Sequence, residues 1–303
     1  TAQILYGMYF ILTAIQVVLL LLGGMNLFDS LIHAFGTAGT GGFSNYADSV
    51  GHFNSAYLDG VISVFMILFG INFNLYFFLA VREFKLVFKN EELRAYLLII
   101  SGAVVMIMIN IYPIYGSVAE AFRYSAFQVA SIITTTGYAT ADYMLWPEFS
   151  RCVLVALMII GGCASSTGGG IKVSRLLISL KSIYKEIKQM LHPKSVNVVK
   201  LNKKKLGEDT IRNVYVYLLA YITLAIVSVL IVSLDNFDFE TTVGSVITAL
   251  GNVGPGLGMT GPVGSFADYS LLAKFVFCLD MLAGRLEIFP FLMLFSYVWR
   301  KKF

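Results

Sequence analysis

Long apolar runs alternate along the chain with short polar segments that are rich in glycine and threonine. Most runs hold about 20 residues, the length at which a helix crosses a hydrocarbon core of about 30 Å. They cover residues 4–22, 57–81, 96–111, 214–234 and 269–299, with a further run that starts near Phe149. Between them lie amphipathic stretches of roughly 10 to 15 residues, which are too short to span a membrane. The pattern predicts an all-α polytopic membrane protein.

The same order of segments occurs three times. An apolar run leads to a short amphipathic stretch, then to a glycine-rich segment, and then to a second apolar run. Non-helical backbone at membrane depth is tolerated only where it is buried in protein or lines a water-filled cavity. Each unit therefore predicts an outer helix, a half-membrane pore helix, an extended loop and an inner helix. The expected units are residues 1–93, 94–210 and 211–303.

Charge is scarce and unevenly placed. With 57% hydrophobic and 13% charged residues, the chain cannot cover a soluble domain of this size with polar side chains. Basic residues gather in 82–94, in 181–212 and in the C-terminal "WRKKF", so these segments are predicted to be cytoplasmic. Such juxtamembrane clusters do not indicate a nucleic-acid partner. The 181–212 segment is either a solvated connector or a docking surface for a cytosolic partner.

The three polar loops have the composition of a cation filter. A cation that crosses a membrane exchanges its hydration shell for protein oxygens, and backbone carbonyls in an extended row supply them densely. Glycine permits the dihedral angles that such a row needs, and threonine adds hydroxyl oxygens. Alignment on the glycine predicts K⁺ at the carbonyls of three strands: Thr40, Gly41, Gly42, Phe43; Thr135, Thr136, Gly137, Tyr138; and Asn252, Val253, Gly254, Pro255.

The inner helix of the middle unit is interrupted by "GGCASSTGGG". Five glycines in ten residues make a continuous helix unfavourable by several kcal/mol. A flexible loop across the conduction path is the favoured interpretation, and a small-residue helix-packing patch is the alternative. The predicted gating residues are Gly161, Gly162, Cys163, Ala164, Ser165, Ser166, Thr167, Gly168, Gly169 and Gly170.

Arg285 lies inside the last apolar run, where a charge is costly and usually has a task or a partner. Neither Asp280 nor Glu287 has the helical spacing that would pair it with this arginine. The positive charge is predicted to act as an electrostatic barrier below the filter. A structural salt bridge to another helix is the alternative.

Enzymatic activity is not expected. "CASSTGGGIKVS" departs from a phosphate-binding loop, because Ile171 separates the last glycine from Lys172. "GNVGPGLG" lacks the spacing of a dinucleotide fingerprint. The sequence shows no catalytic or metal-ligand constellation, and no covalently bound cofactor is expected.

Four motifs together resemble the TrkH family of bacterial potassium-uptake proteins: "ITTTGYATADY", "GGCASSTGGGIKVSR", "LGNVGPGLG" and "DMLAGRLEIFPFL". The resemblance implies four helix–loop–helix units around one pore in the inner membrane and K⁺ entry down its electrochemical gradient. It also implies a homodimer embedded in lipid, and a TrkA-like cytosolic ring through which a nucleotide regulates the pore. By motif match, Gly42, Gly137 and Gly254 take the filter-glycine roles, 161–170 the gating-loop role and Arg285 that of the pore arginine.

The chain supplies three of the four expected filter strands. A chain that starts with Thr1 directly before an outer helix is expected to lack the first unit. Two alternatives to K⁺ uptake remain open, a Na⁺-permeable or Na⁺-coupled relative and a non-conducting membrane scaffold.

Overall fold

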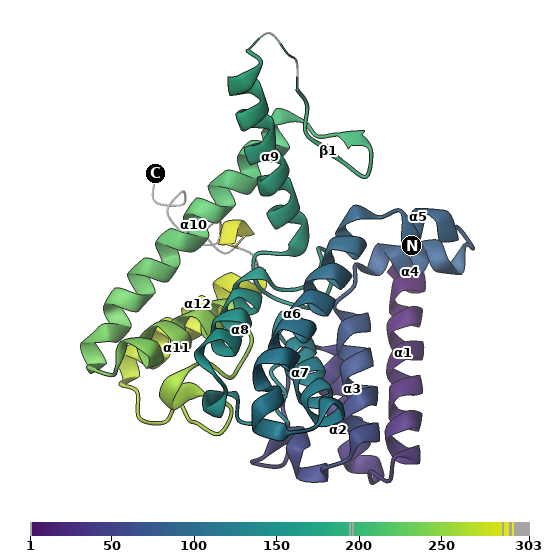
Figure 1. Cartoon of the computed structure of the whole chain (residues 1–303), viewed down its shortest axis with the longest axis vertical. Coiled ribbons are helices and arrows are strands. Elements are labelled where there is room, and N and C mark those ends of the chain that lie inside the picture. The colour runs from purple at the N-terminus through teal and green to yellow at the C-terminus, as the bar shows by residue number, and fades with distance from the viewer. Residues whose placement is uncertain (1, 194, 196, 287, 291–292, 294–303) are drawn as a thin grey trace.

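The described part of the chain is mostly helical, with one short hairpin (Figure 1). The computed structural model describes residues 2–193, 195, 197–286, 288–290 and 293. The first third holds an outer helix, a short second helix, a loop and an inner pair, followed by a short connecting helix. These elements are α1 (Ala2–Leu22), α2 (Leu27–Ala38), the 3₁₀ turn η1 (Ser49–Phe53), α3 (Ala56–Phe69), α4 (Phe73–Ala80) and α5 (Phe84–Phe88).

The same order recurs in the rest of the chain. The middle elements are α6 (Glu91–Tyr115), α7 (Val118–Ile133), η2 (Tyr143–Leu145), α8 (Glu148–Ile160), α9 (Val173–Leu191) and the strands β1 (Lys200–Leu201) and β2 (Lys204–Lys205). The last are α10 (Glu208–Val232), η3 (Ser233–Asp235), α11 (Phe239–Gly251), η4 (Gly258–Thr260) and α12 (Leu271–Leu286). The expected unit divisions, after residues 93 and 210, fall in the first turns of α6 and α10.

The expectation of one continuous inner run over 57–81 is wrong in detail. This run is two helices, α3 and α4, bent by 92° at residues 70–72. Gly70 sits so close to the Tyr96 hydroxyl that an added Cβ would lie 2.3 Å from it. Asn72 then starts α4 by accepting a 3.0 Å hydrogen bond from the backbone N–H of Asn74. Gly70 thus ends α3, and Asn72, two residues later, caps the start of a new helix that runs in another direction.

Helices α2, α7 and α11 are the short ones predicted between the apolar runs. They hold 12, 16 and 13 residues, so they extend roughly 18 to 24 Å and cannot cross a 30 Å core. Asn26 caps α2 by accepting 2.8 Å from the N–H of Asp29. Asp238 caps α11 by accepting 2.9 Å from the N–H of Thr241. Each short helix leads directly into one of the three polar loops.

Two described helices are long and apolar enough to cross a membrane, α6 and the 208–235 stretch that contains α10. The bent pair α3–α4 is a third candidate, and residues 6–22 form a shorter apolar helix. In Figure 1 the segment around α5 and the β1–β2 hairpin lie in the upper half, whereas α6 turns into α7 and α10 into α11 in the lower half. The described basic clusters thus share one side. The "WRKKF" cluster and the end of the last apolar run lie outside the described residues.

Candidate functional site

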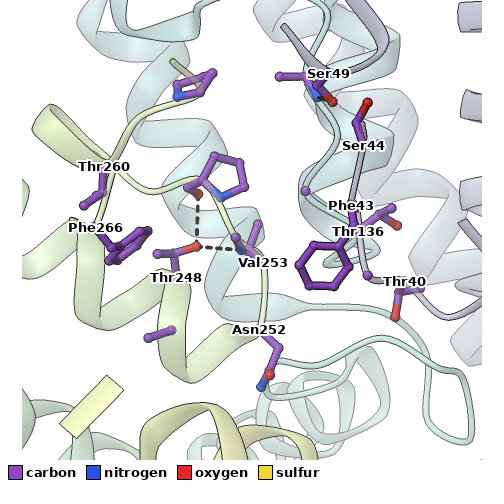
Figure 2. Close-up of a pocket in the computed structure, with 18 of the residues that line it drawn as sticks. Thr40, Phe43, Ser44, Ser49, Thr136, Thr248, Asn252, Val253, Thr260 and Phe266 are labelled. Carbon is purple, nitrogen blue, oxygen red and sulfur yellow. Dashed lines mark hydrogen bonds between the residues drawn. The ribbon is translucent and has the colours of Figure 1, made fainter. Parts of the chain in front are cut away.

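The three predicted strands surround one cavity of about 700 Å³ (Figure 2). Ten of their twelve residues line it, together with Arg285 of α12. The exceptions are Thr135 and Tyr138, which are fully buried behind the lining. None of the residues 161–170 belongs to the lining. The three strands, whose glycines lie 95 and 117 residues apart in sequence, therefore meet at one cavity.

The strands share an uncommon backbone. In each, the glycine and the residue two positions before it have a positive φ. This conformation costs threonine about 1–2 kcal/mol, whereas asparagine adopts it more readily. The φ values are 49° at Thr40 and 63° at Gly42, 56° at Thr135 and 87° at Gly137, and 56° at Asn252 and 111° at Gly254. Three repetitions of a costly pattern make the strands structurally equivalent.

Each strand is held to its own short helix by the same hydrogen bond. The residue before the glycine donates its backbone N–H to the carbonyl five positions earlier. The pairs are Gly41 to Gly36 at 2.7 Å, Thr136 to Ser131 at 2.9 Å and Val253 to Thr248 at 3.0 Å. These N–H groups are therefore already satisfied by the helix end and do not face the cavity.

Neighbouring strands touch through their glycines. A Cβ added at Gly42 would lie 1.9 Å from the carbonyl oxygen of Thr136, and one added at Gly137 would lie 2.0 Å from that of Val253. A Cβ at Gly254 would meet only the Cα of Gly137, at 3.9 Å. The strands thus pack in sequence order, and the described residues leave the space beside Gly254 largely open.

A second set of hydrogen bonds holds the carbonyl that follows each glycine. Ser131 Oγ donates to the Tyr138 carbonyl at 2.6 Å, and Thr248 Oγ1 donates to the Pro255 carbonyl at 3.0 Å. In the first strand the equivalent residue, six positions before the glycine, is Gly36, which has no hydroxyl. The Tyr138 hydroxyl fills the space beside Gly36 and lies within hydrogen-bond distance of two carbonyls, that of Phe43 at 3.3 Å and that of His33 at 3.2 Å. Sequence reasoning missed these supports, although Ser131 and Thr248 share an offset of six residues before the glycine.

The Gly161–Gly170 segment lies between α8 and α9 and contacts the starts of all three strands. Thr40 Oγ1 donates to the Thr167 carbonyl at 3.0 Å, and the N–H of Gly169 donates to Thr135 Oγ1 at 2.6 Å. A Cβ at Gly169 would lie 2.2 Å from the carbonyl oxygen of Gly251, just before the third strand. The segment is non-helical and packs closely against the starts of the strands. Small residues are needed there for contact with backbone, not for packing of one helix face.

Arg285 also reaches the first strand. Its guanidinium donates to Thr40 Oγ1 at 3.2 Å and to the Gly39 carbonyl at 3.0 Å. Asp280 instead accepts from Ser228 Oγ at 2.7 Å. Glu287 lies outside the described residues. Within the described part of the chain Arg285 forms no ion pair, so its contacts there are to a hydroxyl and a carbonyl beside the cavity.

Comparison with known proteins identifies the family. The model of the TrkH cation transport proteins matches residues 1–301. The Trk system potassium uptake protein TrkH of Salmonella typhimurium is 35% identical over 99% of this chain and 63% of its own length, and that of Escherichia coli K12 is 34% identical with the same coverage. The crystal structure of the potassium transporter TrkH from Vibrio parahaemolyticus superposes with a TM-score of 0.90 at 34% identity. It is matched over 97% of this chain and 64% of its own.

The chain therefore spans slightly less than two thirds of the length of these relatives. Three observations agree with one another: the family model matches residues 1–301, the fold is helical, and one backbone geometry is repeated in three strands. This chain belongs to the TrkH family of cation transport proteins.

Proposed function

We propose that this chain forms most of a pore through which K⁺ enters a bacterial cell across its inner membrane. The observation that carries the proposal is the triple repetition of one costly backbone pattern around a single cavity. Carbonyl-rich extended segments of this kind can replace the hydration shell of a cation. The relatives named as potassium uptake proteins supply the choice of K⁺.

The filter in this proposal consists of the strands Thr40–Phe43, Thr135–Tyr138 and Asn252–Pro255. Because each strand packs against the next and Gly254 faces open space, we assign a fourth strand of the same design to that side. It would close the ring around the ion path. The units 1–93, 94–210 and 211–303 are then successive sectors of that ring.

Gating belongs to the Gly161–Gly170 segment and to Arg285 in this account. The segment contacts the start of each strand, so its displacement would change the width of the path there. Arg285 places a positive charge beside Thr40, where it would oppose tight trapping of a cation. The basic β1–β2 hairpin region, placed on the cytoplasmic side, is a suitable docking surface for a TrkA-like nucleotide-binding ring. Assembly as a homodimer completes the proposal.

Ion flux into liposomes that contain the intact protein tests the proposal. K⁺ uptake that exceeds Na⁺ uptake supports a potassium pore. Uptake of both ions at similar rates would favour a Na⁺-permeable relative. No uptake by correctly folded protein would favour a non-conducting scaffold.

A further inference from the structure

A buried glutamate at the start of α6 contacts the Gly161–Gly170 segment at a residue that does not touch the strands. Glu92 is only 5% exposed. Its Oε1 accepts a 2.6 Å hydrogen bond from the backbone N–H of Ala164. Its Oε2 accepts from Asn72 Nδ2, at 3.4 Å, in the bend between α3 and α4. One carboxylate therefore joins three separate parts of the chain.

The neighbouring anchors of the segment are backbone groups. The N–H of Cys163 donates to the Gly70 carbonyl at 3.0 Å, and the Ser165 carbonyl accepts from the N–H of Phe73 at 3.2 Å. Glu92 supplies the side-chain anchor between them. A buried carboxylate is costly unless hydrogen bonds compensate it, so its place here is explained by the groups that it holds.

Glu91, the residue before Glu92, connects the start of α6 to the β1–β2 hairpin. Glu91 pairs through its carboxylate with Lys181 of α9. Its backbone N–H donates to Asn202 Oδ1 at 2.8 Å, in the turn between β1 and β2. Lys181 also donates to the Lys200 carbonyl at 2.8 Å. Adjacent residues of one helical turn thus hold the hairpin on one side and the Gly161–Gly170 segment on the other.

We propose that Glu92 is a positioning residue that latches the Gly161–Gly170 segment in its observed place, and that Glu91 and Lys181 couple this latch to the β1–β2 hairpin. Movement of the hairpin then loosens the hydrogen bond to Ala164 through the first turn of α6. One consequence rests on the proposed transport function, namely that a loosened segment changes K⁺ flux. The hydrogen bonds themselves do not depend on that function.

The labelling rate of the Cys163 thiol can report on the hydrogen bond between Glu92 and Ala164. Cys163 is fully buried and directly precedes Ala164, whereas Cys152 and Cys278 are exposed. The intact protein carrying Cys152→Ala and Cys278→Ala is reconstituted in liposomes and treated with N-ethylmaleimide, a membrane-permeant thiol reagent. The rate of Cys163 labelling then measures how often the segment opens, whether or not the protein conducts ions.

Two substitutions of Glu92 distinguish the effect of side-chain length from the effect of charge. Glu92→Gln keeps an oxygen that can accept from Ala164 but loses the charge and the acceptor for Asn72. Cys163 labelling should stay within about twofold of the parent, because the bond to Ala164 is the one that holds the segment. Glu92→Asp keeps the charge on a side chain about 1.5 Å shorter, and labelling should rise about tenfold. Glu92→Ala should match or exceed the Asp variant. If Glu92→Ala does not fold, the Gln and Asp variants still decide the question.

The control is Glu83→Ala, which removes the same charge from an exposed position near α5. It should leave the labelling rate unchanged. Equal rates in the parent and in all Glu92 variants would overturn the latch. Faster labelling of the Gln variant than of the Asp variant would overturn it as well, because charge and not reach would then hold the segment.

The coupling has its own test. Lys181→Ala should raise Cys163 labelling a few-fold in the parent and add nothing to Glu92→Ala, since both act through one latch. Independent effects that multiply in the double variant would overturn the coupling. K⁺ flux is measured on the same samples. Labelling that follows these expectations without flux in any sample would refute the transport proposal alone, and normal flux with unchanged labelling would refute the latch alone.

Discussion

The hydroxyl of Thr135 accepts a 2.6 Å hydrogen bond from the backbone N–H of Gly169, 34 residues further along the chain. Both residues are buried. This bond joins the second strand of the cavity to the segment that interrupts the middle inner helix. It shows that the two polar stretches singled out in the sequence are parts of one site.

Removal of this acceptor should loosen the junction. Thr135→Val keeps the shape of the side chain but leaves the Gly169 N–H buried without its partner, a loss of about 1–3 kcal/mol. The thermal unfolding midpoint of the intact protein should fall, and K⁺ flux should change with it. Thr135→Ser restores the hydroxyl and should behave like the parent. Equal midpoints for the Val and Ser variants would contradict a role for the bond.

The strand glycines should not tolerate alanine equally. Gly137→Ala adds a Cβ that would lie 2.0 Å from the Val253 carbonyl oxygen at a φ of 87°, so the strands must separate. Gly254→Ala meets only backbone strain of about 1–2 kcal/mol within the described residues. K⁺ flux should be abolished in the first variant and reduced less in the second.

Gly102→Ala is the matched control for these glycines. Gly102 lies in α6 with nothing within 4 Å of an added Cβ, and alanine favours a helix over glycine by up to about 1 kcal/mol. This variant should keep its flux and unfold at the same or a slightly higher temperature. Loss of flux comparable to that of Gly137→Ala would mean that the method does not report on the strands.

Arg285 should limit conduction. Arg285→Ala removes the charge beside Thr40 and both of its hydrogen bonds, so flux should rise or become less dependent on regulation. Arg285→Lys keeps the charge and should stay closer to the parent in flux, although lysine cannot reproduce the planar geometry of the guanidinium. Unchanged flux and unchanged unfolding temperature in the Ala variant would refute the barrier role.

Acid should weaken the start of α11. Hydrogen bonds from Thr241 hold the pKa of Asp238 below its usual range. A carboxylate whose pKa is lowered by folding contributes stability above its unfolded pKa and loses that contribution as the pH falls through the folded value. Asp238→Asn keeps a good cap and should therefore remove this part of the acid sensitivity. Asp238→Ala should cost about 1 kcal/mol near neutral pH, reduced further by solvent exposure.

The check is a series of unfolding temperatures from pH 7 down to pH 3 in the parent and the two variants. The parent should lose more stability than Asp238→Asn over the acidic end of the series. Parallel curves would show that the cap does not depend on ionisation.

Much of the architecture followed from sequence pattern. The short helices α2, α7 and α11, the interruption after α8 and the all-helical class were expected from apolar run lengths and glycine content. The 92° bend after Phe69 was not expected, and Gly70 at this bend lies against the Tyr96 hydroxyl of another helix. Local composition does not report such a long-range contact.

The site was foreseen in part for the same reason. Glycine alignment selected Gly42, Gly137 and Gly254, and the structure gives all three a positive φ. It did not reveal that the Tyr138 hydroxyl of the neighbouring strand lies beside Gly36, where the other two strands have a hydroxyl of their own helix. Glu92 gave no sequence signal, since a charged residue at a helix start is ordinary.

Potassium entry into liposomes tests the central claim most directly. The intact protein is reconstituted, K⁺ is supplied outside with or without an excess of Na⁺, and accumulation inside is followed over time. The account predicts K⁺ accumulation that a Na⁺ excess barely slows and that Gly137→Ala abolishes. Folded protein that admits no K⁺, or Gly137→Ala protein that admits it at the parental rate, would contradict the account.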